Sequence, residues 1–402
     1  MKILIVSATL PGPRWGASAR NFHLLKALAR QHTVALLTVI NDTEMSALDD
    51  LRLLEAFTQH VQTIPLRVQR AKRQRQLLSV ARRRSYLLNL FILPEMQAAL
   101  DAMLARERYD LVLFESVLMA GYRLPAGMKV VIDQHNLEFE IVQRTYEQEQ
   151  RFLRKWYNWR EYRLLKRGEL ERCRAADLVV VTSERERLVL KELLPGQSVE
   201  VVSNGVDLET FSRDETAEEM PHQLIFTGTM DYHPNTQAAV FFAERCWPLI
   251  RRQIPDATWQ IVGRNPPPEI QRLAQLPGVT VTGWVPDVRP YLARAALAIA
   301  PLLIGGGTRL KILEAFAMQK AVVSTSLGCE GIAVEPGKHL VVRDKPEAFA
   351  DAVIALLQHP EQRAAYGAAG RALVETTYSW ERCGADLLRA LERHCFHEGM
   401  RV

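Results

Sequence analysis

The 402-residue sequence has few cysteines and no long apolar run. Its five cysteines are scattered and none forms a Cys-x-x-Cys pair, which disfavours a disulfide framework and a structural zinc site and indicates a reducing compartment. No stretch approaches the roughly 18 apolar residues that a membrane-spanning helix needs. The sequence also has no Asp-x-Asp pair, so it offers no obvious motif for holding a metal ion.

The amino-terminal residues allow two interpretations. Met1, Lys2 and the apolar residues that follow superficially resemble a signal peptide. The apolar stretch is short, however, and Pro11, Pro13 and Arg14 interrupt it before any cleavage site. We therefore interpret these residues as the first strand of an α/β domain.

The overall composition, 48% hydrophobic and 24% charged, is that of an ordinary globular protein, and the length predicts two or three domains. The net charge of +5 is unevenly spread, because the segment from Val61 to Pro94 contains no acid. Its basic residues are Arg67, Arg70, Lys72, Arg73, Arg75, Arg82, Arg83 and Arg84. Such a patch suggests a polyanion or an anionic membrane surface, and a solvated charged face is the equally weighted alternative.

Predicted strands and helices alternate through both halves of the chain, which indicates parallel sheets. The pattern predicts an α/β fold of two Rossmann-like, doubly wound domains that face each other across a cleft. We expect the first domain at residues 1–202, an acidic linker at 203–222 and the second domain at 223–378. A helix at about 379–396 is a candidate to pack back on the first domain.

The segment Gly305–Glu314 concentrates the chemistry of the second half. A predicted buried strand precedes three glycines, which let the backbone turn tightly and approach a ligand. Thr308 is the expected N-cap of the next helix, whose free N–H groups form an anion site. Arg309 and Lys311 add positive charge to it, and Glu314 could accept from sugar hydroxyls. We interpret the loop as a diphosphate cradle, with tight packing alone as the alternative.

In the first half, His135 follows a predicted strand, at the edge where doubly wound sheets bind ligands. A purely structural role for this histidine is the alternative to ligand binding, and both have equal weight. Residues 138–174 are predicted to form one long helix. We interpret its aromatic stripe of Phe152, Trp156 and Trp159 as core or interdomain packing rather than a ligand platform.

The ordered set of motifs carries a family resemblance over nearly the whole chain. The motifs are the loop with Gly16, His135, Asn204-Gly205-Val206-Asp207, Phe226-Thr227-Gly228-Thr229-Met230 with Pro234-Asn235, Ile261-Val262-Gly263, Gly283-Trp284-Val285, the Gly305–Glu314 loop and Val322–Gly331. Together they resemble the retaining glycosyltransferases of GT-B fold in glycosyltransferase family 4.

This resemblance implies that the second domain binds a nucleoside-diphosphate sugar. Glu314 matches the last Glu of the family's Glu-x7-Glu motif, which binds the ribose hydroxyls, whereas Gly306 stands where the family has the first Glu. Thr229 and Met230 stand where many relatives carry an Arg and a Lys for the diphosphate. The cations of the glycine loop could supply the missing charge.

On this basis we assign site residues by resemblance. His135, Arg309 and Lys311 are the expected catalytic residues, with His135 contacting the donor sugar. The expected donor-binding residues are Gly16, Gly228, Thr229, Gly263, Val285, Gly306, Gly307, Thr308 and Glu314. No metal ligand and no cofactor beyond the nucleotide-sugar co-substrate are expected.

The resemblance implies retaining, metal-independent transfer of a sugar to a glycan or lipid-linked acceptor, in cell-envelope or exopolysaccharide synthesis. We expect a cytoplasmic protein, with peripheral attachment to the inner face of the membrane through residues 67–84 as an option, and no nucleic-acid partner. Two alternatives stay open. One is a nucleotide-sugar 2-epimerase on the same fold, and the other is a non-catalytic protein that binds anionic membranes.

Overall fold

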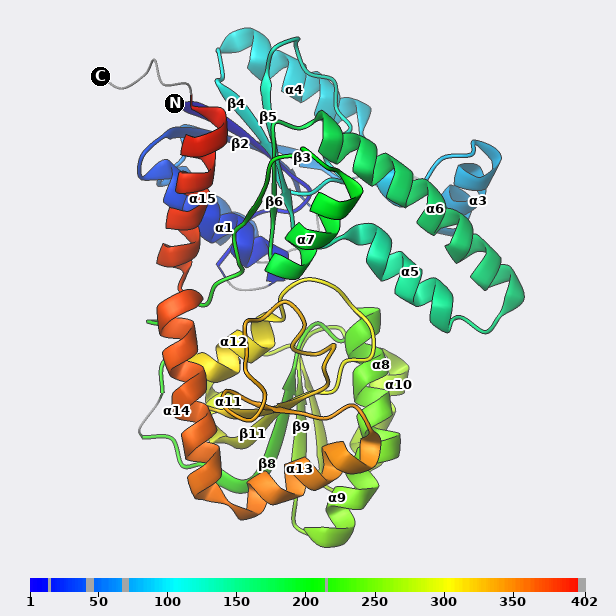
Figure 1. Cartoon of the computed structure of the whole chain (residues 1–402), viewed down its shortest axis with the longest axis vertical. Coiled ribbons are helices and arrows are strands. Elements are labelled where there is room, and N and C mark those ends of the chain that lie inside the picture. Colours follow the sequence, from blue (N-terminus) through cyan, green and yellow to red (C-terminus); the bar gives the residue numbers. More distant parts are fainter. Residues whose placement is uncertain (14–15, 41–46, 67–71, 214–215, 397–402) are drawn as a thin grey trace. The chain divides into compact units, whose positions relative to one another are not determined.

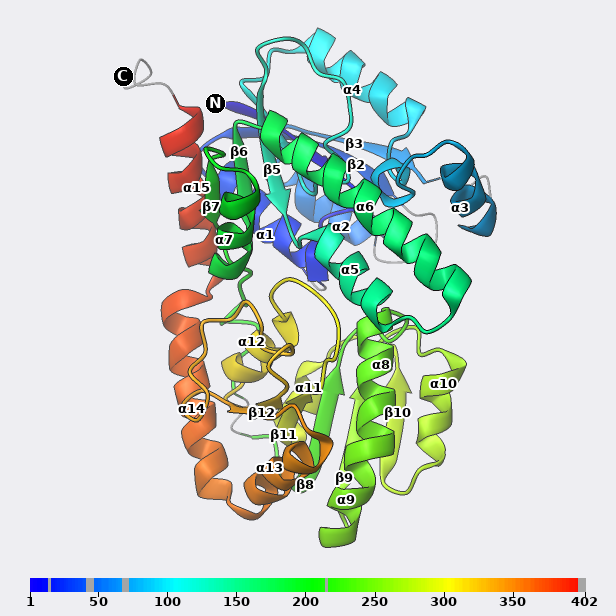
Figure 2. The same cartoon turned by 45° about the vertical axis from the view of Figure 1, so that its right-hand side comes forward.

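The computed structural model describes residues 1–13, 16–40, 47–66, 72–213 and 216–396. The chain divides into two compact units, Met1–Ser203 with Trp380–Val402, and Asn204–Ser379. In each unit a parallel sheet is covered by helices (Figures 1 and 2). No helix among the described residues is both long and apolar enough to cross a bilayer.

The sheet of the first unit has the strand order β3-β2-β1-β4-β5-β6-β7, and all its pairings are parallel. Its strands are β1 (Lys2–Ser7), β2 (Thr33–Ile40), β3 (His60–Pro65), β4 (Leu111–Phe114), β5 (Lys129–Gln134), β6 (Leu178–Val181) and β7 (Val199–Val201). The run Ile3–Val6 is fully buried, as expected where helices cover both faces of a sheet. The strand order reverses between β1 and β4, and ligands bind at such switch points in open α/β sheets.

The helices of the first unit differ from the sequence prediction in the segment 138–174. They are α1 (Gly16–Ala29), α2 (Ala47–Glu55), α3 (Lys72–Ala81), the 3₁₀ turn η1 (Leu87–Asn89), α4 (Pro94–Arg106), α5 (Glu138–Gln148), α6 (Phe152–Ala175), α7 (Glu184–Leu193) and α15 (Trp380–Cys395). The single helix predicted over residues 138–174 is therefore wrong, because α5 ends at Gln148 and α6 starts at Phe152. The two helices pack against each other, so the chain must reverse between them.

A buried carboxylate on α6 holds the start of α5. The side chain of Glu169 is fully buried and accepts hydrogen bonds from the backbone N–H groups of Glu138 (3.1 Å) and Phe139 (2.9 Å). The amide of Gln134, at the end of β5, also donates to it. Glu169 thus satisfies N–H groups that a helix start leaves without intrahelical partners, and it anchors the segment that follows β5.

A second buried carboxylate on the same helix, Glu161, holds η1. It accepts from the hydroxyl of Ser85 (2.6 Å) and from the backbone N–H groups of Tyr86 and Leu87 (both 3.0 Å). The neighbouring Arg160 donates to the carbonyl of Ser79 at the end of α3 (2.7 Å). The basic segment is therefore fastened to α6 at its carboxyl end, while residues 67–71 lie outside the described residues.

The carboxy-terminal helix α15 belongs to the first unit. Trp380, at its start, stacks on His23 of α1 with ring centroids 4.8 Å apart. A side chain at Gly384 would lie 2.5 Å from the Cβ of Ala27, so the two helices approach closely here. The helix expected at about 379–396 is thus part of the same core as α1.

The sheet of the second unit has the order β10-β9-β8-β11-β12-β13, again with parallel pairings. Its strands are β8 (Met220–Thr227), β9 (Thr258–Val262), β10 (Val279–Gly283), β11 (Ala295–Ala300), β12 (Ala321–Ser324) and β13 (Val341–Val342). The predicted linker at 203–222 is wrong in its extent, because the second unit begins at Asn204 and β8 begins at Met220. Glu219 bonds Lys320 (3.0 Å), which fastens this stretch to the unit.

The helices of the second unit are α8 (His233–Phe241), α9 (Trp247–Gln253), α10 (Pro268–Gln271), α11 (Arg289–Arg294), α12 (Leu310–Ala317), α13 (Pro346–Gln358) and α14 (Pro360–Thr377). A π-helical turn, η2 (Phe242–Cys246), joins α8 to α9, and the 3₁₀ turn η3 (Arg272–Gln275) follows α10. Pro248 lacks an N–H group and crowds the preceding turn, which accounts for the widening at η2. The core of this unit packs around Phe242 and Trp259, whose ring centroids lie 4.7 Å apart.

Replacement of Glu169 by Ala should destabilise the first unit, because the N–H groups of Glu138 and Phe139 would stay buried without their acceptor. We expect a loss of about 2–4 kcal/mol in the free energy of unfolding, measured by urea denaturation. Amide hydrogen exchange at these two residues should accelerate. The control is Glu171→Ala, since Glu171 is exposed and accepts from the likewise exposed Arg167, and its cost should stay within about 0.5 kcal/mol. Equal losses in both variants would contradict the role of Glu169.

Candidate functional sites

Three glycines lie side by side at the carboxyl ends of β8, β9 and β10. The N–H of Gly228 donates to the carbonyl of Val262 (3.1 Å), and the N–H of Gly263 donates to that of Gly283 (3.2 Å). A Cβ at Gly263 would lie 1.6 Å from the carbonyl oxygen of Gly228. The predicted donor-binding residues Gly228 and Gly263 thus form one edge, where only glycine lets the backbones approach this closely.

The loop before α12 turns at two glycines. Gly305 and Gly307 have φ values of 132° and 66°, which favour glycine. The N-cap of α12 is Arg309, in an extended conformation and without a side-chain cap, so the prediction of Thr308 as N-cap is wrong by one residue. Thr308 is instead buried in the loop, and Gly306 is half-buried.

Arg309 organises this loop from within. Its Nη1 donates to the carbonyls of Gly306 and Gly307, and its Nη2 lies 3.4 Å from the carbonyl oxygen of Leu327. Arg309 as a whole is 8% exposed. The positive charge therefore lies at the loop, as predicted, but these donors are directed at the loop's own carbonyl oxygens.

Lys311 contacts one residue of α8 and one residue of β8. Its Nζ donates to the amide oxygen of Asn235 (2.8 Å) and lies 4.0 Å from the ring centroid of Phe226, the residue before Thr227 in β8. The amide nitrogen of Asn235 in turn donates to the carbonyl of Thr229 (2.9 Å). Burial, followed by the charge of Arg309, lowers the pKa of Lys311 to about 7, and the charge of Glu314 opposes this shift only in part.

Glu314 lies one turn further along α12 and is half-buried. Burial raises the pKa of Glu314 to about 7, although the charge of Lys311 opposes this shift. The two groups therefore lie close enough to interact electrostatically, and both change charge near neutral pH. Such perturbed values cluster at functional sites, because a bound ligand can supply the missing partner for each group.

The remaining predicted donor-binding residues, Thr229, Val285 and Gly16, lie in three different surroundings. Thr229 is half-buried next to Gly228, and a side chain at Gly305 would lie 3.7 Å from the Cβ of Pro234, so the Gly305 loop adjoins the start of α8. Val285 has a buried side chain in the core, so it can offer a ligand only its backbone. Gly16 belongs to the first unit, where it starts α1 at φ 50° with open space around its Cα.

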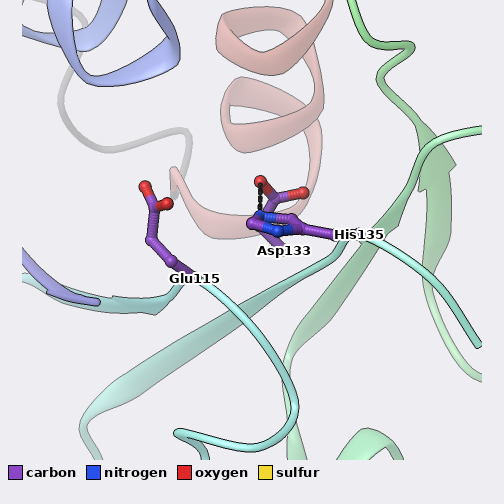
Figure 3. A group of neighbouring side chains, drawn as sticks. All are labelled: Glu115, Asp133 and His135. Atoms are coloured by element: carbon purple, nitrogen blue, oxygen red, sulfur yellow. Dashed lines mark ion pairs between the residues drawn. The ribbon is translucent and has the colours of Figure 1, made fainter. Parts of the chain in front are cut away.

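The predicted His135 lies in a buried polar network of the first unit (Figure 3). Its Nε2 is 3.4 Å from Asp133 Oδ2, at the carboxyl end of β5. Asp133 accepts from Nε and Nη2 of Arg20 on α1 (2.9 and 2.7 Å), and both partners are almost fully buried. Burial would raise the pKa of Asp133, but the charges and hydrogen bonds of Arg20 and His135 together outweigh burial and hold this pKa well below its usual value. Asp133 is thus an anion within ion-pair distance of the imidazole.

Glu115 is the fourth member of this network and directly follows β4. It is 3% exposed, and its Oε2 is buried without a hydrogen-bond partner among the described residues. Burial and the nearby charge of Asp133 raise the pKa of Glu115 well above its usual value, against the charge of Arg20. This shift favours the protonated form of the carboxyl group, which can donate a hydrogen bond.

The spacing of this network resembles a metal site, but its charges do not. Ligand atoms of Glu115, Asp133 and His135 lie within 4.8 Å of one another. Both oxygens of Asp133 already accept from Arg20, whose positive charge would repel a cation. A hydrogen-bond network that presents His135 and a neutral carboxylic acid fits these contacts better than a metal centre.

The sequence analysis missed three residues of these sites, Arg20, Glu115 and Asp133, and it quoted Asn235 in a motif without assigning a role to its amide. The sequence could have indicated Glu115, because this acid directly follows an apolar predicted strand. His135 was identified from the same kind of position, after the next strand. Arg20 had none, since it lies 113 residues from Asp133 and an arginine on a predicted helix is ordinarily exposed.

Comparisons with known proteins agree with this architecture. A family model described as "Glycosyltransferase Family 4" matches residues 16–210, and one described as "Glycosyl transferases group 1" matches residues 221–359. A phosphatidyl-myo-inositol mannosyltransferase of Mycobacterium tuberculosis is 28% identical over 228 residues, which cover 53% of this chain and 58% of the relative. The chain thus spans little more than half the length of this curated relative.

Solved structures match over almost the whole chain. Sucrose-phosphate synthase of Thermosynechococcus elongatus has a TM-score of 0.71 at 16% identity, covering 98% of both chains. Anabaena HepE in complex with UDP has a TM-score of 0.69 at 15% identity, covering 98% of this chain and 100% of the other. At such identities the likeness shows the fold, and the predicted class of two Rossmann-like parallel-sheet domains is confirmed.

Replacement of Gly263 by Ala should disrupt the glycine edge, because the new Cβ would overlap the carbonyl of Gly228. We expect the free energy of unfolding to fall by about 2–4 kcal/mol, measured by urea denaturation. Gly196→Ala is the control, since Gly196 also has positive φ but open space around it. It should cost only about 1 kcal/mol. A cost for Gly263→Ala no greater than for the control would show that the edge tolerates a side chain.

Proposed function

Because the chain belongs to glycosyltransferase family 4 and has the GT-B fold, we propose that it transfers a sugar from a nucleoside-diphosphate sugar to a glycan or lipid-linked acceptor. The observation that carries this proposal is the cluster in the second unit. A glycine edge, a glycine loop before a helix start, and Lys311 with Glu314 lie together there. The glycine loop, the helix start and Lys311 suit a diphosphate, and Glu314 suits the hydroxyls of a ribose.

The cluster supports departure of a nucleoside diphosphate without a metal ion. Negative charge develops on the β-phosphate as the glycosidic bond breaks, and preorganised donors stabilise that charge. Lys311 can supply the cation, and the N–H groups of the Gly305–Gly307 loop and of the first turn of α12 can supply hydrogen bonds. Glu314 would accept from the ribose hydroxyls. Arg309 supports the reaction indirectly, by holding the loop in shape.

The first unit would serve the sugar and the acceptor. We propose that His135, oriented by Asp133, contacts the transferred sugar, and that neutral Glu115 donates a hydrogen bond to a hydroxyl of either substrate. The anomeric configuration would be retained by same-face attack, with the leaving phosphate accepting the proton of the acceptor hydroxyl. In atom balance, the sugar–phosphate bond breaks and the sugar–acceptor bond forms.

A role in cell-envelope or exopolysaccharide synthesis is the final part of the proposal. Its support is the curated relatives, which include a phosphatidyl-myo-inositol mannosyltransferase and a 24% identical protein from the cps region of Klebsiella pneumoniae. The second candidate is a nucleotide-sugar 2-epimerase, which would need an acid/base pair such as Glu115 and His135. Incubation of the nucleotide sugar without acceptor separates the two, because only an epimerase would release the epimeric sugar nucleotide.

The donor site is tested by thermal shift with UDP, GDP, ADP, CMP and their sugars, in EDTA. A ligand at about 100 times its dissociation constant should stabilise the wild type by roughly 2.7 kcal/mol. Glu314→Ala should lose most of this stabilisation, because the ribose hydroxyls lose their acceptor. The control is Glu244→Ala, which removes an exposed carboxylate on η2. Stabilisation that requires a divalent cation, or that survives in Glu314→Ala, would contradict the proposed donor site.

The pH dependence of nucleotide binding tests Lys311. Because its pKa is lowered to about 7, the free protein loses this charge as the pH rises. Affinity for the preferred nucleoside diphosphate should therefore fall by roughly tenfold or more between about pH 7 and about pH 9, measured by isothermal titration calorimetry. Lys311→Arg should bind with little dependence on pH, since arginine stays charged. Lys311→Met should bind weakly at every pH, and a wild-type slope preserved in Lys311→Arg would assign the titration to another group.

A further inference from the structure

The first half of α6 exposes an apolar row that the core does not use. The exposed fractions are 81% for Phe152, 77% for Leu153, 47% for Trp156 and 38% for Trp159. Their spacing places them along one side of the helix. Of the predicted core or interdomain packing of this stripe, the core packing is wrong, because the buried side of α6 is formed by Glu161, Leu165, Glu169 and Cys173.

Helix α3 lies beside this row and extends it. Arg160 of α6 donates to the carbonyl of Ser79 on α3, and Figures 1 and 2 both show the two helices next to each other. Leu77 of α3 is 70% exposed. We call the exposed residues of α3, of the turn at 82–84 and of residues 151–163 the α3–α6 surface.

The charges of this surface have one sign. Arg82, Arg83 and Arg84 are exposed in the turn after α3, and Arg151, Arg154 and Arg163 are exposed on or next to α6. The acid within residues 151–163, Glu161, is buried and bonded to η1. Arg163 lies over the ring of Trp159, 5.2 Å from its centroid. The surface therefore combines exposed aromatic side chains with arginines that form no ion pair with an acid among the described residues.

We propose that the α3–α6 surface docks on an anionic lipid bilayer. Tryptophan and phenylalanine partition to the level of the head groups, and arginines bind the lipid phosphates, so both features of the surface would be satisfied at once. A second copy of the chain is a poorer occupant, because two such surfaces would bring arginines face to face. The inference does not depend on sugar transfer.

The cavity next to this surface also favours a lipid over a nucleic acid. A cavity of about 640 Å³ in the first unit is bordered by Arg83 and Arg84, and its other lining residues include Leu88, Phe114 and Ile132. Two arginines thus lie at a cavity whose lining combines apolar side chains with polar ones such as Asn89 and Arg167. An amphiphilic anion offers complementary groups to both, whereas a nucleic-acid backbone offers none for the apolar lining.

Cosedimentation with vesicles tests the proposal, using phosphatidylcholine alone or mixed with phosphatidylglycerol. The wild type should bind the anionic vesicles more tightly, and binding should weaken as salt is added. Joint replacement of Arg82, Arg83 and Arg84 by Gln should lower the partition coefficient on the order of 100-fold at low salt. Phe152→Ser with Trp156→Ser should lower it by about tenfold or more.

Matched controls separate this surface from general effects of charge and apolarity. Joint replacement of Arg245, Arg252 and Arg272 by Gln removes the same charge from exposed positions of the second unit. Leu188→Ser removes an apolar side chain that is 56% exposed on α7. Both controls should bind vesicles as the wild type does.

Three outcomes would overturn the proposal. One is equal binding to neutral and anionic vesicles, and another is loss of binding in the charge control as large as in the arginine-turn variant. The third is a dimer in light scattering that Phe152→Ser with Trp156→Ser converts to monomer, because a second copy would then cover the row. Transfer to a soluble acceptor, or nucleotide binding, is measured without vesicles, so failure here leaves the proposed function to its own tests.

Discussion

Both units depend on the parallel direction of their strands. Because every strand of a sheet points the same way, the carboxyl ends collect at one edge and the loops there can share a ligand. In the second unit this edge is built of glycine backbones and is completed by Lys311. In the first unit the same edge carries Glu115 and His135, which follow neighbouring strands.

The two sheet edges differ in how the charges of their buried polar groups are balanced. The first unit buries an ion pair between Arg20 and Asp133, where close, two-point contact offsets the cost of removing both charges from water. The second unit leaves Lys311 with a neutral amide and an aromatic ring as partners, so its charge is incompletely compensated. The Arg20–Asp133 pair lies beside His135 and is already balanced in charge. The charge of Lys311 is not fully balanced, so a bound anion would stabilise it.

Helix α6 connects the interior of the first unit with its surface. Its buried side carries two carboxylates that accept from the backbone of η1 and of α5, so these segments are positioned by hydrogen bonds as well as by apolar packing. Its opposite side, in the first half of the helix, carries aromatic and basic residues in contact with solvent. One helix thus positions the segment after His135 and presents the proposed membrane surface.

The sequence by itself determined the alternation of strands and helices, and with it the α/β class and the positions of the glycines at strand ends. These features depend on local periodicity and backbone freedom, which neighbouring residues control. Only the tertiary structure decided the partners of the charged groups. Lys311 meets Asn235 across 76 residues, and Arg20 meets Asp133 across 113. Burial likewise distinguished Glu161 from Phe152, against the expectation from residue type, because burial depends on which side of a helix other elements cover.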